Sequence, residues 1–364
     1  MKAMRWHDKG DIRIDDVPQP QPGPDEVLIE VTFSGICGSE VHEYLAGPIF
    51  IPLEPHPITG TQAPQIMGHE FGGRIVELGS EVSDLKEGQI VTVNPILTCG
   101  KCVNCLSNLP NLCDKLAYYG LIGDGGHAEY AAVKAANCVT VPDDVPAEYV
   151  AWGEPAGVAF HAISRAAIKP ESSVVVLGGG PIGQLAAQYS RCAGAEKVFL
   201  TEVAPKRAEW AMEIGAVDEV FNPVETDIIE EILSRTDGRG TDYAIECSGG
   251  SKAGLLEDTA AQAVELTRPE GTTVIVGTFA QPTEFHFNNI VLLERKVMGS
   301  WVWRSADEYR DAMAKIIEGK VKVLPLISDR IQLDNGVQDG IQALHLNRDE
   351  HMKILIDVRN GDQR

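Results

Sequence analysis

Residues 174–183 read V-V-V-L-G-G-G-P-I-G, and this stretch decides the fold of the middle of the chain. Its apolar first part, 174–177, predicts a strand buried on both faces, and the pattern of residues 184–193 predicts an amphipathic helix directly after it. Strands that alternate with helices predict an α/β fold with a parallel, doubly wound sheet of the Rossmann type. Four further strands are expected, with helical segments between them, at 197–200, 219–221, 243–247 and 273–276.

The turn between the first strand and its helix fits the pattern G-x-G-x-x-G, in the strand–turn–helix context that makes the pattern informative. Gly178 permits the tight turn, Gly180 lets a pyrophosphate approach the backbone, and Gly183 permits close packing of helix on strand. Pro181 and Ile182 complete the turn, and the phosphates would lie beside free N–H groups at the helix N-terminus. The alternative is a strand, turn and helix that bind no ligand.

An acidic residue at the end of the second strand of such a fold binds a ribose hydroxyl of the dinucleotide. Glu202 occupies that place, and a carboxylate there repels a 2′-phosphate, so NAD is favoured over NADP. Arg207 is a further candidate for cofactor binding. Together with Lys206 it weakens the preference for NAD, since an arginine can accommodate the phosphate.

The first third of the chain has a different pattern, with short alternating segments such as 27–31, 75–79 and 88–93 interrupted by glycine and proline. Such segments predict an antiparallel, barrel-like unit, and no long helix is expected before about Val145. We expect three parts in sequence order: a catalytic domain, a nucleotide-binding domain and a return segment that completes the first domain, at 1–155, 156–293 and 294–364.

Four cysteines are grouped in one short segment with the spacing C-x₂-C-x₂-C-x₇-C: Cys99, Cys102, Cys105 and Cys113. Four thiolates at this spacing can close a tetrahedron around zinc with no position left for water, which is typical of a structural site. We therefore expect a structural zinc in a lobe at about 95–115. Disulfides or an iron–sulfur cluster are the alternatives, although the spacing matches neither ferredoxin pattern.

Three more segments carry residue types that bind zinc, although they are far apart in sequence. They read G-I-C-G-S-E-V-H at 35–42, G-H-E-F-G-G at 68–73 and G-E-P-A at 153–156. Any one of them alone would more often be structural, because a cysteine or histidine at a strand edge commonly just packs. Together with a dinucleotide fold downstream, they indicate a catalytic metal.

With these motifs, the four-cysteine lobe and the segment G-G-H-A-E-Y at 125–130, the chain resembles the zinc-containing medium-chain alcohol and polyol dehydrogenases over nearly its whole length. The resemblance implies a GroES-like catalytic domain and a second, open zinc site. It implies that Cys37 and His69 are ligands, that Glu154 is the third ligand as in the polyol branch, and that Glu70 sits beside the metal and can enter or leave its shell. The expected cofactors are therefore two Zn²⁺ per chain and NAD.

In that family zinc acts as a Lewis acid while hydride passes between the carbinol carbon and the nicotinamide. The resemblance implies that Ser39 and His42 carry the released proton outward, with the cofactor ribose between them. Three residues depart from the family pattern: Glu40 and Gln89 stand where aspartate is usual, and His127 stands where phenylalanine is common. His127 is either a packed loop residue or an additional catalytic group.

The segment Glu43–Pro52, with His56–Gly60 after it, is rich in proline and is expected to be an ordered loop over the substrate. It resembles the (R,R)-2,3-butanediol dehydrogenase branch of the family, which implies the interconversion of butanediol and acetoin. The loop could instead brace the barrel or an oligomer contact. The alternative functions are a sorbitol or other polyol dehydrogenase, an L-threonine 3-dehydrogenase, and a non-catalytic nucleotide-binding relative.

The overall composition limits the partners. A net charge of −22 argues against binding to nucleic acid and to anionic membranes. The first residues show no signal peptide, and no apolar run reaches membrane-spanning length, so we expect a cytoplasmic protein. By resemblance we expect a homodimer or homotetramer, joined at an edge strand near 297–301.

Overall fold

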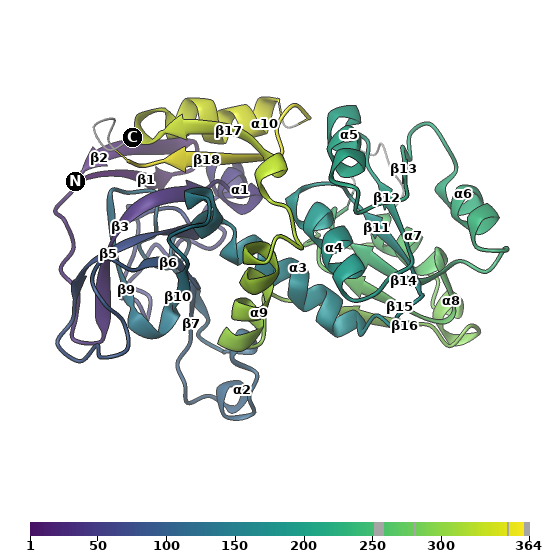
Figure 1. The fold of residues 1–364 in the computed structure, drawn as a ribbon, viewed down its shortest axis with the longest axis horizontal. Helices are drawn as coiled ribbons and strands as arrows, with labels where there is room; N and C mark the ends of the chain where they lie inside the picture. Colours follow the sequence, from purple (N-terminus) through teal and green to yellow (C-terminus); the bar gives the residue numbers. More distant parts are fainter. Residues whose placement is uncertain (251–257, 280, 348, 360–364) are drawn as a thin grey trace. The chain divides into compact units, whose positions relative to one another are not determined.

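The computed structural model describes residues 1–250, 258–279, 281–347 and 349–359 (Figure 1). These residues form two compact units. The first contains Met1–Glu154, Arg304–Ile317 and the described residues from Ile327 onward, and the second contains Pro155–Trp303 and Glu318–Leu326. The return segment was expected to begin at residue 294, whereas the chain re-enters the first unit at Arg304. Strand β16 (Lys296–Gly299) still belongs to the parallel sheet of the second unit.

The first unit is built mainly from antiparallel strands. A three-stranded sheet has the order β2-β1-β4, and a larger sheet has the order β10-β6-β5-β3-β18-β17, with β9 also paired to β3. Its core includes the fully buried side chains of Trp6, Phe71, Val91 and Ile354. The strands are β1 (Lys2–Asp8), β2 (Asp11–Asp16), β3 (Glu26–Gly35), β4 (Gln65–Ile66), β5 (Glu70–Leu78), β6 (Ile90–Val93), β7 (Ile96–Leu97), β8 (Ala117–Tyr118), β9 (Tyr130–Lys134), β10 (Cys138–Val141), β17 (Ile327–Gln332) and β18 (Lys353–Asp357).

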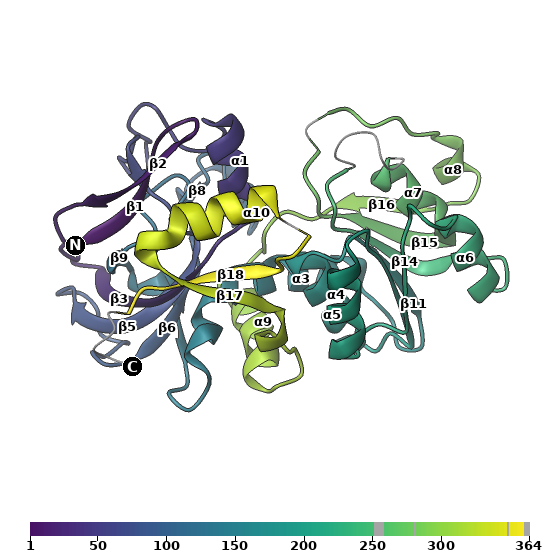
Figure 2. The same ribbon diagram turned by 90° about the horizontal axis from the view of Figure 1, so that it is seen from above.

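Strand β3 lies between β5 and β18 in this sheet and brings the residues of the candidate site together. It pairs with β5 through Gly35 opposite Glu70, and with β18 through Gly35 opposite Leu355. The end of β3, the start of β5 and the start of β18 therefore lie side by side, although β18 comes from the far end of the sequence. Figure 2 shows β18, in yellow, within the first unit.

Helix α1 (Gly38–Ala46) follows β3 directly, so the first residues of the expected loop 43–52 are helical and that part of the loop prediction was wrong. The helix forms because the Glu40 carboxylate accepts the backbone N–H of Cys37 across its first turn, 2.9 Å away. The unit also contains the α-helices α2 (Val103–Leu106), α9 (Ala306–Ile317) and α10 (Ala343–Leu346), a π-helical segment, Gly336–Gln342, and short 3-10 helices.

The second unit holds a six-stranded sheet with the order β13-β12-β11-β14-β15-β16, and all its pairings are parallel. This is the doubly wound order 3-2-1-4-5-6, and the predicted Rossmann fold is confirmed. Helices α4 and α5 cover one face and α6 and α7 the other (Figures 1 and 2). The bounds are α3 (Gly153–Ala166), β11 (Ser173–Leu177), α4 (Pro181–Cys192), β12 (Lys197–Thr201), α5 (Pro205–Ile214), β13 (Glu219–Phe221), α6 (Ile228–Arg235), β14 (Thr241–Glu246), α7 (Thr259–Glu265), β15 (Thr267–Ile275), α8 (Asn288–Val291) and β16 (Lys296–Gly299).

Within the described ranges, no helix has both the length and the apolar character needed to cross a membrane.

Candidate zinc centres and nucleotide site

The glycine-rich turn has the geometry that the motif predicts. Gly178 follows β11 with φ of +95°, a conformation that side chains disfavour. A Cβ on Gly183 would lie 1.8 Å from the carbonyl oxygen of Gly178, so only glycine lets α4 approach the strand this closely. Gly180 precedes α4 and Pro181 is its first residue, where a missing N–H costs nothing. The turn therefore presents backbone N–H groups at a helix N-terminus, as phosphate binding requires.

Glu202 lies against this turn, at the end of β12. Its Oε2 accepts the N–H of Gly179 at 2.9 Å, and its Oε1 accepts the N–H groups of Val203 and Ala204 at 2.7 and 2.8 Å. The buried Arg207 approaches the same turn, since a Cβ built on Gly180 would lie 3.9 Å from its Nη1. The acid and the arginine named by the sequence are thus both beside the glycine turn.

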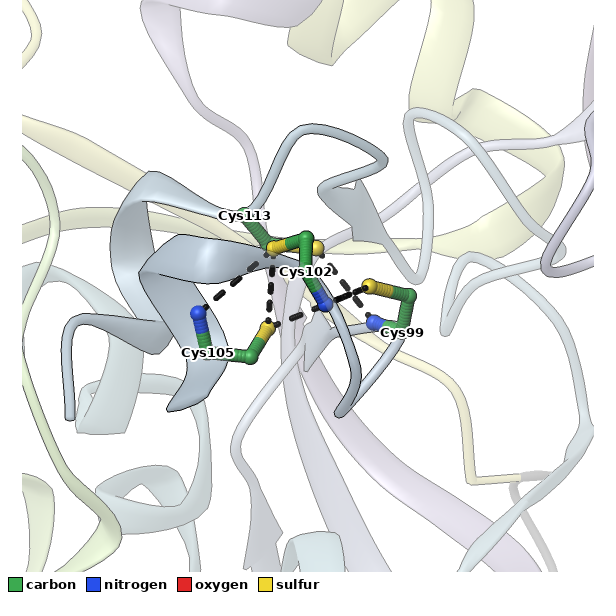
Figure 3. Close-up of side chains that lie close together, drawn as sticks. All are labelled: Cys99, Cys102, Cys105 and Cys113. Carbon is green, nitrogen blue, oxygen red and sulfur yellow. Dashed lines mark hydrogen bonds between the residues drawn. The ribbon is translucent and has the colours of Figure 1, made fainter. Parts of the chain in front are cut away.

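The four cysteines of the lobe direct their sulfurs toward one another (Figure 3). Their Sγ atoms lie within 4.8 Å of each other, with 3.5 Å between Cys102 and Cys105 and 4.0 Å between Cys99 and Cys105. These separations are close to the distance of about 3.8 Å between the sulfurs of a tetrahedral zinc site with Zn–S bonds of about 2.3 Å. All four cysteines are free, so the four thiols fit a structural zinc and the disulfide alternative finds no support.

Backbone N–H groups point at these sulfurs and favour thiolates. The N–H of Cys99 donates to Sγ of Cys113 at 3.3 Å, and the N–H of Cys102 donates to Sγ of Cys99 at 3.3 Å. The N–H of Cys105 and further hydrogen bonds lower the pKa of Cys102 to about 6, whereas burial and the neighbouring thiols raise the pKa of Cys105 to about 12. In the absence of metal, the lobe thus holds a thiol that ionises readily, Cys102, beside one that stays protonated, Cys105.

A second cluster brings together Cys37, His69 and Glu70. Cys37 lies between β3 and α1, while His69 and Glu70 stand at the start of β5, which pairs with the end of β3. One donor atom from each residue lies within 4.8 Å of the other two, and both His69 and Glu70 are buried. A thiol, an imidazole and a carboxylate are the donor types that zinc binds, so this set fits a zinc site with an open position.

Lys353, which sequence reasoning missed, enters this cluster from β18. Its Nζ donates to both carboxylate oxygens of Glu70, at 2.6 and 2.8 Å, and to the carbonyl of Ile36 at 3.2 Å. Burial would lower the pKa of Lys353, but the charges of Glu70 and Cys37 outweigh burial and raise it. The signal in the sequence was a charged residue directly before the apolar run I-L-I at 354–356.

Glu154 is buried near the cluster, but it is outside the group whose donor atoms lie within 4.8 Å, so its role as a ligand stays a prediction. Burial raises the pKa of Glu154 to about 7, and the charges of Glu70 and Glu40 act in the same direction. Glu70, and not Glu154, is therefore the carboxylate that lies close enough to Cys37 and His69 to share a metal ion with them. The carboxylate of Glu70 is at the same time bonded to Lys353.

Glu40 is fully buried and lies between two histidines. Its Oε1 is 3.3 Å from Nδ1 of His69, and its Oε2 is 3.3 Å from Nε2 of His127. Burial alone would raise the pKa of Glu40, but the two rings outweigh it and lower that pKa. For His69, burial would lower the pKa, but Cys37 and Glu40 outweigh it and the pKa is raised. Two of the three departures from the family pattern, Glu40 and His127, are thus in contact with each other.

Ser39 and His42, the residues named for proton transfer, both lie on α1. In the part of the chain that the structure describes, the buried Oγ of Ser39 has no hydrogen-bond partner, whereas His42 is exposed. The carboxylate of Glu43, also on α1, accepts the N–H groups of Ile49 at 2.9 Å, of Phe50, and of Ile51 at 3.1 Å. The segment after the helix is therefore an ordered loop anchored by Glu43.

Comparisons with known proteins agree with this geometry. Residues 23–143 match the family described as alcohol dehydrogenase GroES-like domain, and residues 181–318 match the family described as zinc-binding dehydrogenase. The chain is 36% identical over 359 residues to (R,R)-butanediol dehydrogenase of Neisseria gonorrhoeae, covering 98% of this chain and 99% of that protein. It is 33% identical over 334 residues to L-threonine 3-dehydrogenase of Pyrococcus furiosus, covering 92% of each.

The structure is also similar to the crystal structure of 2R,3R-butanediol dehydrogenase from Bacillus subtilis. The TM-score is 0.89 at 36% identity, and the match covers 98% of this chain and 99% of the other. The predicted combination of a GroES-like domain with a Rossmann sheet is confirmed by these matches.

Proposed function

Because the chain belongs to the zinc-binding alcohol dehydrogenases, oxidoreductases that act on CH–OH groups, we propose that it interconverts a small vicinal diol and its hydroxyketone. We assign (R,R)-2,3-butanediol and acetoin as the pair and NAD as the hydride acceptor. One observation carries the proposal: a thiol, an imidazole and a carboxylate meet within 4.8 Å in a chain that is similar to (R,R)-butanediol dehydrogenases over 98% of its length.

Cys37 and His69 would hold the catalytic zinc, with Glu154 or Glu70 as the third protein ligand. Bound zinc supplies a Lewis acid for the substrate oxygen, and the nicotinamide supplies the hydride acceptor. Lys353 holds both oxygens of Glu70, which opposes the entry of this carboxylate into the ligand shell. We propose that Glu154 is the ligand while Lys353 and Glu70 stay paired.

The proton released on oxidation needs a route to solvent. The Oγ of Ser39 is buried and lacks a hydrogen-bond partner among the described residues, so it is available to bond to a substrate hydroxyl. His42 is exposed one helical turn further along α1, and an imidazole titrates near neutrality. We propose that Ser39 takes the proton first and that His42 passes it to water, with the cofactor ribose between them.

The composition of the loop at 45–52 favours a small, uncharged substrate. Residues 45–52 include no charged side chain, whereas a charged substrate such as an amino acid needs a partner of opposite charge. The carboxylate of Glu43 holds the backbone N–H groups of Ile49, Phe50 and Ile51, so this part of the loop has a defined course. Ile51 packs in the core of the first unit, whereas Ile49 is half exposed. We propose that this loop covers the diol.

The preference for NAD rests on Glu202. Its carboxylate is fixed against the glycine turn, where it would meet the 2′ position of the adenosine ribose. We expect kcat/KM to be higher with NAD than with NADP by at least about tenfold, and replacement of Glu202 by alanine to reduce this ratio. A higher kcat/KM with NADP would contradict the assignment.

A substrate panel tests the function. NADH formation is measured with (R,R)-, meso- and racemic 2,3-butanediol, sorbitol and L-threonine, and zinc is counted on the same preparation. The highest kcat/KM is expected with (R,R)-2,3-butanediol. A higher value with sorbitol or L-threonine than with any butanediol would refute the diol assignment.

L-threonine 3-dehydrogenase is the second candidate, because several threonine dehydrogenases are 33% identical to this chain over 92% of its length. The substrate would then carry an ammonium and a carboxylate group. The absence of charged side chains from 45–52 favours the diol.

We also propose a homodimer or homotetramer joined at β16, in the cytoplasm. Strand β16 is at the edge of the parallel sheet, and apolar side chains are exposed on it and next to it: Phe287, Val291, Leu292, Val297 and Trp301. Eight free cysteines suit a reducing compartment. Light scattering should report a dimer or tetramer for the wild type and a smaller species for Val297→Asp, and a monomeric wild type would contradict the assembly.

A further inference from the structure

A line of four buried polar side chains runs from the sheet to the proposed zinc ligand: Ser34, His127, Glu40 and His69. Ser34 Oγ is 2.8 Å from Nδ1 of His127, and Nε2 of His127 is 3.3 Å from Oε2 of Glu40. The other oxygen, Oε1, is 3.3 Å from Nδ1 of His69. We propose that His127 is a positioning residue that fixes the Glu40 carboxylate and, through it, the ring of His69 at the zinc site.

The bonding of Glu40 explains why a third residue is needed. Each of its oxygens accepts one backbone N–H and faces one imidazole: Oε1 accepts the N–H of Gly68 at 2.9 Å, and Oε2 accepts the N–H of Cys37 at 2.9 Å. With His127 removed, Oε2 would keep only one donor, and a buried carboxylate with missing partners rotates or admits water. The orientation of His69 would then be less sharply defined.

The direction of the hydrogen bonds follows from the acceptor. An ionised carboxylate only accepts hydrogen bonds, so the ring nitrogen of His127 that bonds to Glu40, Nε2, is the donor. In the neutral ring, Nδ1 of His127 then accepts a hydrogen bond from the hydroxyl of Ser34. Nδ1 of His69 lies 3.3 Å from Oε1 of Glu40 but does not have hydrogen-bond geometry in this structure. Donation from Nδ1 to Glu40 in the zinc-bound protein would leave Nε2 for the metal, which is the arrangement that second-sphere carboxylates impose on zinc-bound histidines.

The ring of His127 is held in one place by the surrounding backbone. The backbone N–H of His127 donates to the carbonyl of Met67 at 2.9 Å, and the backbone carbonyl of His127 accepts the N–H of Met4 at 2.8 Å. A Cβ on Gly68, which has φ of +99°, would lie 2.5 to 2.7 Å from His127 backbone and ring atoms. The ring thus packs directly on the residue before His69 and has little freedom to turn away from Glu40.

The inference rests on the proposed zinc site and is tested by zinc affinity. Three variants separate the two ring nitrogens: His127→Gln can place its amide nitrogen near the position of Nε2, His127→Asn near that of Nδ1, and His127→Phe retains only bulk. Zinc is withdrawn from each holoenzyme with a chelating dye, and the absorption spectrum of the cobalt-substituted protein reports the geometry of the catalytic site. The four-cysteine zinc in the same molecule is the internal control.

We expect His127→Asn and His127→Phe to lower the affinity of the catalytic zinc about tenfold and to shift the cobalt spectrum, while the four-cysteine zinc is unchanged. His127→Gln should stay within about threefold of the wild type. The same zinc affinity and cobalt spectrum in all three variants would overturn the proposal. An equal loss of affinity in His127→Gln and His127→Asn would also overturn it, as would a matching loss at the four-cysteine site, because either result indicates that His127 contributes packing alone. A wild type that holds zinc only at the four cysteines would instead refute the proposed function.

Discussion

The four cysteines of the lobe come from one short segment, whereas Cys37, His69 and Glu70 come from two separate segments. Three of the four lobe cysteines are partly exposed, but His69 and Glu70 are buried. In the lobe, neighbouring backbone N–H groups bond to the sulfurs. In the buried cluster, side chains from other elements supply the partners: Lys353 of β18 for Glu70 and Glu40 of α1 for His69.

This difference indicates two kinds of dependence on zinc. The lobe has little apolar core of its own, so zinc is expected to supply its order, and its loss need not reach the chemistry. The buried cluster is already held by the sheet and by the ion pair of Lys353 with Glu70, so zinc is expected to supply chemistry and much less folding energy.

The largest effect is expected for His69→Ala. Loss of the catalytic zinc should reduce kcat/KM for butanediol at least about 10³-fold, or roughly 4 kcal/mol. The variant should keep one zinc per chain, in the lobe, and a circular dichroism spectrum like that of the wild type. A variant with two zincs and wild-type turnover would remove His69 from the site.

Lys353→Met should reduce stability by about 3 kcal/mol, because it leaves the charge of Glu70 buried without its partner. Chemical denaturation measures the loss. The double variant Lys353→Met with Glu70→Gln is the control and should recover most of the stability, since it removes both charges. Equal destabilisation in the single and double variants would show that the ion pair itself is unimportant.

Cys102→Ser should lose the lobe zinc and make residues 95–115 sensitive to proteolysis. The turnover of the folded enzyme should fall by less than about tenfold, because no lobe cysteine belongs to the buried cluster. Cys192→Ser is the matched control, because Cys192 is exposed and belongs to neither cluster. Loss of turnover as deep as that of His69→Ala would contradict the separation of the two sites.

The smallest effect concerns thiol reactivity in the zinc-stripped protein. The pKa of Cys102 is lowered to about 6 and that of Cys105 is raised to about 12, and the thiolate is the reactive form. Cys102 should therefore be alkylated at a rate that is half-maximal near pH 6 and constant above pH 7, while Cys105 stays slow at neutral pH. Mass spectrometry of modified peptides measures both, and bound zinc should protect all four cysteines. Faster alkylation of Cys105 than of Cys102 at pH 7 would contradict these pKa values.

Sequence reasoning succeeded where the pattern is local. The spacing of the four cysteines and the turn 178–183 are read along one segment, and both have the geometry that they predict. The motif at 35–42 predicted Cys37 as a ligand but did not predict helix α1, whose start depends on the hydrogen bond from the Cys37 N–H to the Glu40 carboxylate.

The partners of the buried cluster could not be predicted, because they arise from strand pairing across the chain. Lys353 reaches Glu70 only because β18 pairs with β3, and Ser34 meets His127 only because their segments pack together. The sequence showed that Glu40 and His127 are unusual, but their contact required the fold.

The central claim, that one zinc organises the lobe and another takes part in the chemistry, is tested most directly by counting zinc and measuring NADH formation from (R,R)-2,3-butanediol in three proteins. We expect two zincs per chain in the wild type and one in each of His69→Ala and Cys102→Ser, with turnover abolished only in His69→Ala. A wild type with no more than one zinc per chain, or equal loss of turnover in both variants, would contradict it.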